Sequence, residues 1–125
     1  MEEIAQALFE ALSAGDDDGV RRLCANDFQL RQNGGAPMNL ETLLAFNAQV
    51  HAVASGFHYA NPVRAATPGG FVEEHAVRAS LLGGGRIDLA VVVVGQVSDG
   101  KVTEAREYFD SAGAAPLVAA LSQAR

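Results

Sequence analysis

Lysine and cysteine are almost absent from this chain of 125 residues. Lys101 is its only lysine, and the formal net charge is -6. Proteins that bind nucleic acids present a basic stripe to the phosphates, so we do not expect a nucleic-acid partner. Cys24 is the only cysteine, which rules out an internal disulfide and fits a small buried apolar residue.

Long apolar runs are also missing. No run approaches the roughly 20 residues of a membrane-spanning helix, and the opening Met-Glu-Glu carries no basic segment like that of a secretory signal. A chain of 125 residues buries roughly two-thirds of its unfolded surface in one core. We therefore expect one domain over residues 1–125, located in the cytoplasm, without a membrane partner.

Residues 71–110 predict three meandering β-strands, separated by glycine turns at residues 83–85 and 98–100. Because successive side chains of a strand point to opposite faces, the apolar residues define an inner face. It comprises Glu73, His75, Val77, Ala79, Leu81, Ile87, Leu89, Val91, Val93, Thr103, Ala105, Glu107 and Phe109.

The position of Glu107 depends on the length of the second turn. A three-residue turn, Ser98-Asp99-Gly100, pairs Val91 with Glu107 and places Glu107 inside. A two-residue Asp99-Gly100 turn places it outside, because a slip of one residue exchanges the two faces. With the three-residue turn, Glu107 and His75 lie on strands about 9.6 Å apart, so their side chains can converge on one ligand.

The remaining segments predict helices and two further strands. Apolar residues at helical spacing over residues 4–12 end at Gly15, and the acidic residues 16–18 favour the start of a second helix over a metal site. Residues 27–33 alternate as a strand with Leu30 and Gln32 on its apolar face. Asn39 caps a long helix that Gly56 terminates, residues 57–66 form an edge strand containing Pro62, and residues 114–123 form a last helix.

The chain resembles the SnoaL-like branch of the nuclear transport factor 2-like superfamily over nearly its whole length. The resemblance rests on the break Gly15-Asp16-Asp17, on Asp27-Phe28, and on Asp99-Gly100-Lys101-Val102 followed by Arg106-Glu107-Tyr108-Phe109-Asp110. The last segment is similar to an Arg-Asp-Tyr-Phe-Asp segment of limonene epoxide hydrolases. The resemblance implies an α+β fold: a cone-shaped, curved, mixed β-sheet with helices on its concave face, enclosing a pocket.

The same resemblance suggests roles for single residues. Glu107 stands where the epoxide hydrolases have a water-activating carboxylate, and Gln32 stands near an amide that helps to hold the water. Glu73 and His75 occupy the positions of an arginine and an aspartate, so the arginine is missing. Ketosteroid isomerases use a tyrosine with two aspartates, and that set is not reproduced. SnoaL-type polyketide cyclases need only an inward acid or base, which Glu107 with His75 supplies.

We therefore predict general acid–base chemistry on a hydrophobic small molecule, as in an isomerase, a cyclase or an epoxide hydrolase, without a cofactor. Glu107, His75 and Glu73 are the candidate catalytic residues, and the predicted pocket lining is Gln32, Leu30, Val77, Leu89, Val91 and Phe109. No metal is expected, since Glu73 with His75 does not complete a site. The alternatives are a pocket that binds without turnover and a polar cluster that only fixes strand register.

The outward residues of the central strands are apolar as well, namely Ala90, Val92, Val94, Val72, Ala76 and Val102. A strand that is apolar on both faces is usually covered on both, and the helices can cover only one. The sequence and the resemblance therefore both predict a homodimer through the outer face of the sheet.

Overall fold

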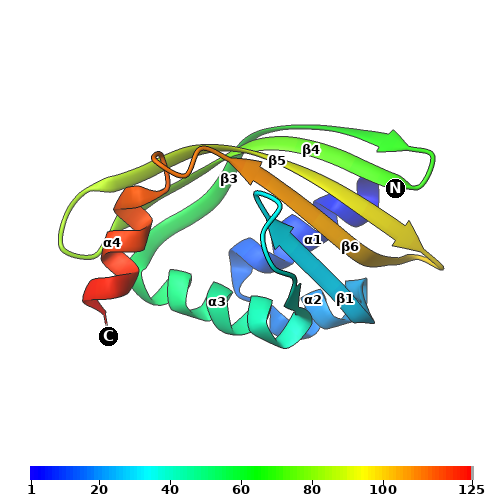
Figure 1. Ribbon diagram of the computed structural model, residues 1–125, viewed down its shortest axis with the longest axis horizontal. Coiled ribbons are helices and arrows are strands. Elements are labelled where there is room, and N and C mark those ends of the chain that lie inside the picture. The colour runs from blue at the N-terminus through cyan, green and yellow to red at the C-terminus, as the bar shows by residue number, and fades with distance from the viewer. Residues whose placement is uncertain (125) are drawn as a thin grey trace.

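The computed structural model, which describes residues 1–124, is a curved six-stranded sheet with all four helices on its concave side (Figure 1). The strands lie in the order β2-β1-β6-β5-β4-β3, with β1 and β6 parallel and the other neighbours antiparallel. The predicted α+β fold with a curved mixed sheet is confirmed. The elements are α1 (Glu2–Ala14), α2 (Asp17–Leu23), β1 (Cys24–Gln32), β2 (Met38–Asn39), α3 (Leu40–Val53), β3 (Ala54–Thr67), β4 (Gly70–Leu81), β5 (Arg86–Ser98), β6 (Lys101–Phe109) and α4 (Ala115–Gln123).

The helix boundaries follow the predicted capping residues. Gly15 ends α1 in the left-handed conformation with φ of 68°. The side chain of Asp16 accepts a hydrogen bond from the Gly19 amide at 3.0 Å, and that of Asn39 accepts one from the Thr42 amide at 2.8 Å. Gly56 does not terminate α3, which ends at Val53. It lies within β3.

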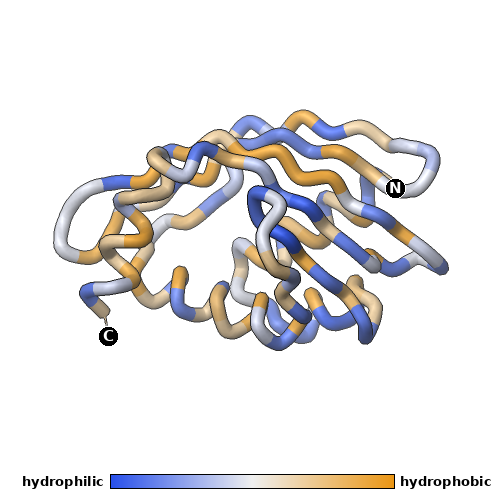
Figure 2. Tube along the Cα trace, in the orientation of Figure 1, coloured by the Kyte–Doolittle hydropathy of each residue, from blue (hydrophilic) through white to orange (hydrophobic). Residues whose placement is uncertain are grey.

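The sheet alternates between a buried and a more exposed face, as predicted for the meander. On β5, Ile87, Leu89, Val91 and Val93 are buried and point toward the helices. Apolar residues dominate the central strands and α4 in the hydropathy trace (Figure 2). Pro62 lies on the edge strand β3, where its missing amide hydrogen interrupts no ladder on the solvent side.

Glu107 lies on the inner face, but the predicted turn is wrong. Ser98 pairs with Lys101 across a two-residue Asp99-Gly100 turn, with φ of 53° and 76°. That turn alone would place Glu107 outside. A β-bulge at Thr103 absorbs one residue, so Val93 pairs with Glu107 and the inward orientation is restored. The predicted partner of Glu107, Val91, is therefore wrong by two residues, which keeps the same face of the sheet.

The bulge also corrects the prediction for Val102. This residue was expected on the outer face, but it is fully buried in the core. Val102 and Glu107 are five positions apart and would lie on opposite faces of a regular strand. The extra residue of the bulge lets both face inward.

A second bulge, in β3, has the same effect and was not predicted. Asn61 and Pro62 together oppose His75, between the pairs Ala60 with Ala76 and Val63 with Glu74. As a result Tyr59 pairs with Val77 and Arg64 pairs with Glu73. Tyr59 and Arg64 are also five positions apart, yet both lie on the inner side of the sheet.

Within residues 1–124, no helix has the length and apolar character needed to cross a lipid bilayer.

Candidate active-site cavity

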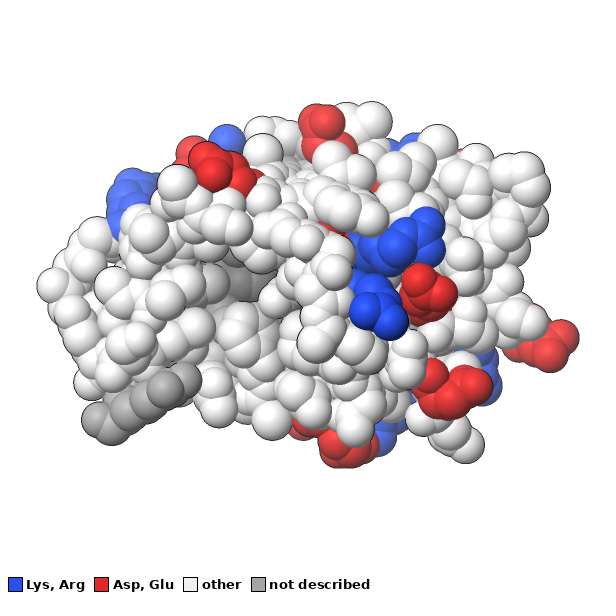
Figure 3. Space-filling view, viewed as in Figure 1, with Lys and Arg blue, Asp and Glu red and all other residues white. Residues whose placement is uncertain are grey.

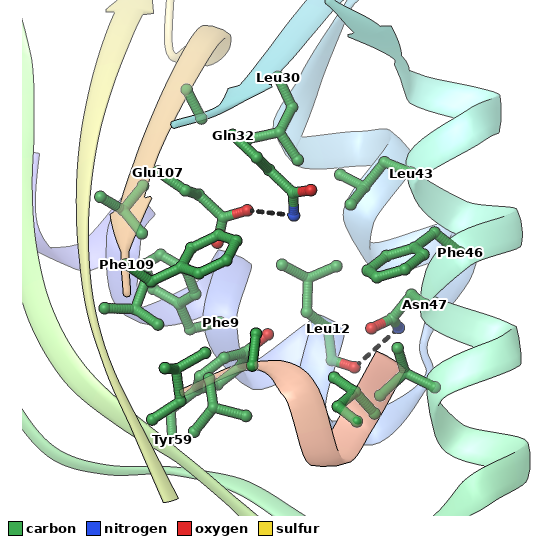
Figure 4. A pocket seen from close by; sticks show the side chains of 18 of the residues that line it. Phe9, Leu12, Leu30, Gln32, Leu43, Phe46, Asn47, Tyr59, Glu107 and Phe109 are labelled. Atoms are coloured by element: carbon green, nitrogen blue, oxygen red, sulfur yellow. Dashed lines mark hydrogen bonds between the residues drawn. The ribbon is translucent and has the colours of Figure 1, made fainter. Parts of the chain in front are cut away.

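A cavity of about 290 Å³ lies between the concave face of the sheet and helices α1, α3 and α4 (Figure 4). In the space-filling view a hollow opens beside α4, and charged side chains lie away from its rim (Figure 3). The lining is almost entirely apolar. It comprises Leu8, Phe9, Leu12, Phe28, Leu30, Gln32, Leu43, Phe46, Asn47, Val50, Phe57, Tyr59, Val77, Leu89, Val91, Val93, Ala105, Glu107, Phe109, Ala114, Leu117, Val118 and Leu121.

The six residues predicted to line the pocket all do so, namely Gln32, Leu30, Val77, Leu89, Val91 and Phe109. Glu107 joins them. The other two candidate catalytic residues, His75 and Glu73, lie on the inner face as predicted but are buried behind the cavity wall and are not part of its lining.

Four polar side chains reach the cavity, from Gln32, Asn47, Tyr59 and Glu107. Asn47 is engaged through its Nδ2 only, which donates to the carbonyl oxygen of Leu12 at 3.0 Å. His51 Nε2 lies 2.9 Å from the same oxygen. These two contacts tie α3 to the end of α1. Asn47 Oδ1, Gln32, Tyr59 and Glu107 are therefore the polar groups that can meet a ligand.

Glu107 is held by a neighbouring strand. Its Cα partner on β1 is Gln32, whose Nε2 donates to Glu107 Oε1 at 3.0 Å. The apolar surroundings raise the pKa of the Glu107 carboxyl above its ordinary value, while the Gln32 hydrogen bond and the nearby His75 oppose that shift. Glu107 Oε2 has no hydrogen-bond partner among residues 1–124. This oxygen is thus available to a ligand.

Tyr59 enters the cavity from β3, with its hydroxyl directed inward (Figure 4). Burial raises the pKa of the Tyr59 phenol, and the negative charges of Glu107 and Glu73 raise it further. The phenol therefore stays protonated and can donate a hydrogen bond.

Behind Tyr59 lies a buried chain of polar side chains. Arg64 Nε donates to Glu73 Oε1 at 2.6 Å, and His75 Nδ1 lies 2.6 Å from Glu73 Oε2. The Arg64 side chain is 21% exposed, whereas those of Glu73 and His75 are 0% and 1% exposed. The rings of Phe9 and Tyr59 cover His75, with centroids 4.8 and 4.5 Å from the imidazole.

Arg64 and the inward Tyr59 were not identified from the sequence. The arginine missing from β4 is thus supplied by β3, where it meets Glu73 and not the cavity. The Pro68-Gly69 turn could have predicted the pairing of Arg64 with Glu73. Thr67 pairs with Gly70, and counting back from this pair brings Arg64 opposite Glu73. Among residues 1–124, no group of three or more His, Cys, Asp or Glu side chains is arranged to hold a metal ion.

Residues 5–105 match the model of the SnoaL-like domain. The chain belongs to the SnoaL-like family. The comparison with curated proteins found no match for this SnoaL-like chain.

Solved structures extend the match of this SnoaL-like chain to the whole fold. PrhC from Penicillium brasilianum has a TM-score of 0.84 at 16% identity, over 97% of this chain and 87% of that one. IdmH from Streptomyces antibioticus, a proposed polyketide cyclase, has a TM-score of 0.81 at 17% identity, over 94% and 97%. A protein of ketosteroid isomerase-like fold from Catenulispora acidiphila, in complex with trimethylamine, has a TM-score of 0.78 at 15% identity, over 96% and 92%. At these identities the comparisons establish the fold.

Proposed function

We propose that this SnoaL-like protein transfers protons on a hydrophobic small molecule, in the manner of an isomerase or a cyclase, with Glu107 as the acid–base group. One observation carries the proposal. Among residues 1–124, Glu107 is the only carboxyl that lines the largely apolar cavity, and an amide from Gln32 orients it. A carboxyl with a raised pKa exchanges a proton with a weakly acidic carbon or oxygen more readily than an ordinary surface carboxylate.

Tyr59 supplies the complementary group. When Glu107 removes a proton from a carbon next to a carbonyl, negative charge develops on the carbonyl oxygen. A phenol that remains protonated in an apolar cavity stabilises that charge by donating a hydrogen bond. Glu107 then returns the proton at a second position, which completes an isomerisation. In a cyclisation the carbanion instead adds to a second carbonyl carbon of the same molecule, the C=O π bond opens to an alkoxide, and that oxygen takes the proton from Glu107.

Epoxide hydrolysis is the less favoured member of the predicted set. By the resemblance, that reaction uses an arginine and an acid near the reacting oxygen. Here Arg64 and Glu73 bind each other behind the wall of the cavity, so they have no contact with a ligand there.

The second candidate function is binding without turnover, as a small-molecule carrier or an interaction module. The favouring observation is that nineteen of the twenty-three lining residues are apolar, so burial of an apolar ligand alone would give affinity. The two functions differ in whether a bound ligand exchanges protons with Glu107.

Enolisation of 2-tetralone separates these functions. The cavity is about twice as large as the roughly 150 Å³ engineered cavity that accepts benzene, so a ketone with two fused rings fits it. We expect the protein to accelerate deuterium incorporation next to the carbonyl in D₂O. The Glu107→Gln variant keeps the hydrogen bond from Gln32 and the shape of the cavity. It should bind 2-tetralone in a thermal-shift assay but lose about 10²- to 10⁴-fold in exchange rate.

Glu104→Gln is the matched control, because Glu104 lies on the same strand and pairs with Arg106 on the outer face. It should exchange at the wild-type rate. Binding by the wild type without acceleration would establish the carrier function. Equal rates in the wild type and Glu107→Gln would exclude Glu107 as the acid–base group.

We also propose that a second copy of the chain covers the outer face of the sheet. The outward side chains of Val72, Ala76, Val92 and Val94 are half-buried, and Val63 is 67% exposed. Light scattering should give twice the 13.0 kDa of one chain, and Val92→Glu should give the monomer. A monomeric wild type at micromolar concentration would contradict this assembly.

A further inference from the structure

His75 carries the only buried side-chain nitrogen or oxygen in residues 1–124 that has no hydrogen-bond partner, its Nε2. An unpaired buried polar atom is unfavourable and is uncommon in folded proteins. The other ring nitrogen, Nδ1, is firmly held by Glu73 at 2.6 Å. The imidazole cannot turn to satisfy Nε2 without losing that bond. The contact of Nδ1 with Glu73 therefore fixes Nε2 in its unpaired position.

The side chains of Arg64 and Glu73 also bear on whether His75 Nε2 donates or accepts a hydrogen bond. The guanidinium of Arg64 and the carboxylate of Glu73 carry opposite charges, so this pair is complete without a second cation. A neutral ring that donates from Nδ1 to Glu73 has its lone pair on Nε2. His75 Nε2 is then a hydrogen-bond acceptor, and its natural complement is the hydroxyl or N–H of a ligand.

The rings of Phe9 and Tyr59 both cover the imidazole of His75. Each ring also packs on two others, Phe9 on Tyr59 and Phe71, and Tyr59 on Phe9 and Phe57. The two residues differ in the backbone that carries them, since Phe9 lies within α1. Tyr59 lies on the edge strand, in a short paired segment between two breaks of the ladder, after Ser55 and after Ala60. Its backbone therefore has fewer restraints, and its ring separates His75 from the cavity.

We propose that His75 Nε2 is a concealed acceptor for the hydroxyl group of the ligand, reached when the Tyr59 ring turns away from the imidazole. This inference rests on the proposed function, since it uses the same cavity, and it narrows the ligand to a fused-ring-sized apolar molecule with a phenolic or enolic hydroxyl. Arg64 is a positioning residue in this scheme, because it acts on the ligand only through Glu73 and His75.

A pair of probes that differ only in the hydroxyl tests the acceptor. Naphthalene reports on the apolar cavity, and 2-naphthol adds one O–H. For the wild type we expect 2-naphthol to bind roughly threefold to tenfold more tightly, the range for one hydrogen bond. In His75→Asn the amide can still donate to Glu73, but no atom remains at the Nε2 position. That variant should bind both probes equally. His58→Asn, which changes an exposed histidine of the same strand as Tyr59, should keep the preference.

The imidazole can be observed directly in the wild type. With ¹⁵N-labelled histidine, the His75 Nε2 resonance should shift on addition of 2-naphthol and stay in place with naphthalene. This measurement decides the question even if His75→Asn unfolds.

The outcomes separate the two proposals. If naphthalene does not bind, the apolar cavity fails as a ligand site, and both the proposed function and the acceptor fall with it. If naphthalene binds but His75→Asn keeps the preference for 2-naphthol, or the Nε2 resonance responds equally to both probes, the acceptor assignment is overturned and the role of Glu107 is untouched.

Discussion

Two glutamates flank Val93 in one row across the inner face of the sheet, and their surroundings differ completely. Glu73 is fully buried and is bound on one oxygen by Arg64 and on the other by His75, both at 2.6 Å. Glu107 is half-buried, lines the cavity and receives one hydrogen bond from a neutral amide, Gln32, at 3.0 Å.

Their partners, and not their residue type or sheet face, distinguish the carboxylate of the buried ion pair from the one proposed as the acid–base group. The Glu73 carboxylate is paired with the guanidinium of Arg64 in the interior. Among residues 1–124, no arginine or lysine side chain pairs with Glu107, and its apolar surroundings raise its pKa. We therefore expect Glu73 to matter for stability and Glu107 for chemistry, and the same substitution at each position should reveal the contrast.

The largest expected effect on stability comes from Glu73→Leu. This variant leaves Arg64 and His75 without their shared partner in the interior. Removing one member of a buried charged pair costs about 3–5 kcal/mol, which lowers the melting temperature of a domain of this size by on the order of 10 °C or more. Glu74→Leu is the control, because Glu74 is the exposed neighbour on the same strand. It should change the free energy of unfolding by less than about 0.5 kcal/mol. Equal effects at the two positions would mean that the buried chain contributes nothing to stability.

Glu107→Leu should behave in the opposite way. A carboxyl that the apolar cavity desolvates is replaced by an apolar side chain of similar volume. We expect the free energy of unfolding to stay unchanged or to rise by up to about 1 kcal/mol, as is common when a functional polar group is removed. Urea unfolding with an unchanged m-value measures this difference. A loss of several kcal/mol would place Glu107 in the same structural class as Glu73.

The sequence predicted those features of the two sites that depend on a local pattern of residues. Alternation along β4 and β5 placed Glu73 and His75 on the inner face, and the capping residues Asp16 and Asn39 placed the helix starts. These features are set by neighbours a few positions away. The resemblance of the segment around Glu107 to a known family gave the fold, which the match over residues 5–105 supports.

The inward orientations of Tyr59 and Glu107 were harder to predict, because each depends on a β-bulge. Whether Arg64 and Tyr59 share a face is decided by one extra residue at Asn61-Pro62. The inward orientation of Glu107 was correct for the wrong reason, since the two-residue turn and the bulge at Thr103 offset each other. A bulge is one residue of mismatch between strands that are distant in sequence, so no periodicity within a single strand reveals it.

The smallest expected effect is on the pH dependence of stability, which should differ between the wild type and the uncharged variant Glu107→Gln. Its pKa is raised in the folded protein above the ordinary 4.5. Below 4.5 the carboxyl is protonated in both the folded and the unfolded chain. As the pH rises above 4.5, the unfolded chain loses this proton first, so the folded chain binds more protons and the stability of the wild type falls. The fall ends once the pH exceeds the folded pKa. Melting temperatures of the wild type and Glu107→Gln, measured from pH 4 upward, should therefore diverge in favour of the variant.

The difference in melting temperature between the two proteins, followed against pH, reports on Glu107. Every other titrating group is present in both proteins, so its contribution to the difference cancels. Glu104→Gln, on the outer face of the same strand, should show no divergence in favour of the variant, because that side chain lies outside the cavity. A difference that stays flat with pH would mean that water in the cavity solvates Glu107 as bulk water does. A difference that reverses sign would mean that His75 and Gln32 together outweigh the effect of burial and keep the carboxylate ionised. In either case a raised pKa could no longer support the role of Glu107 as an acid.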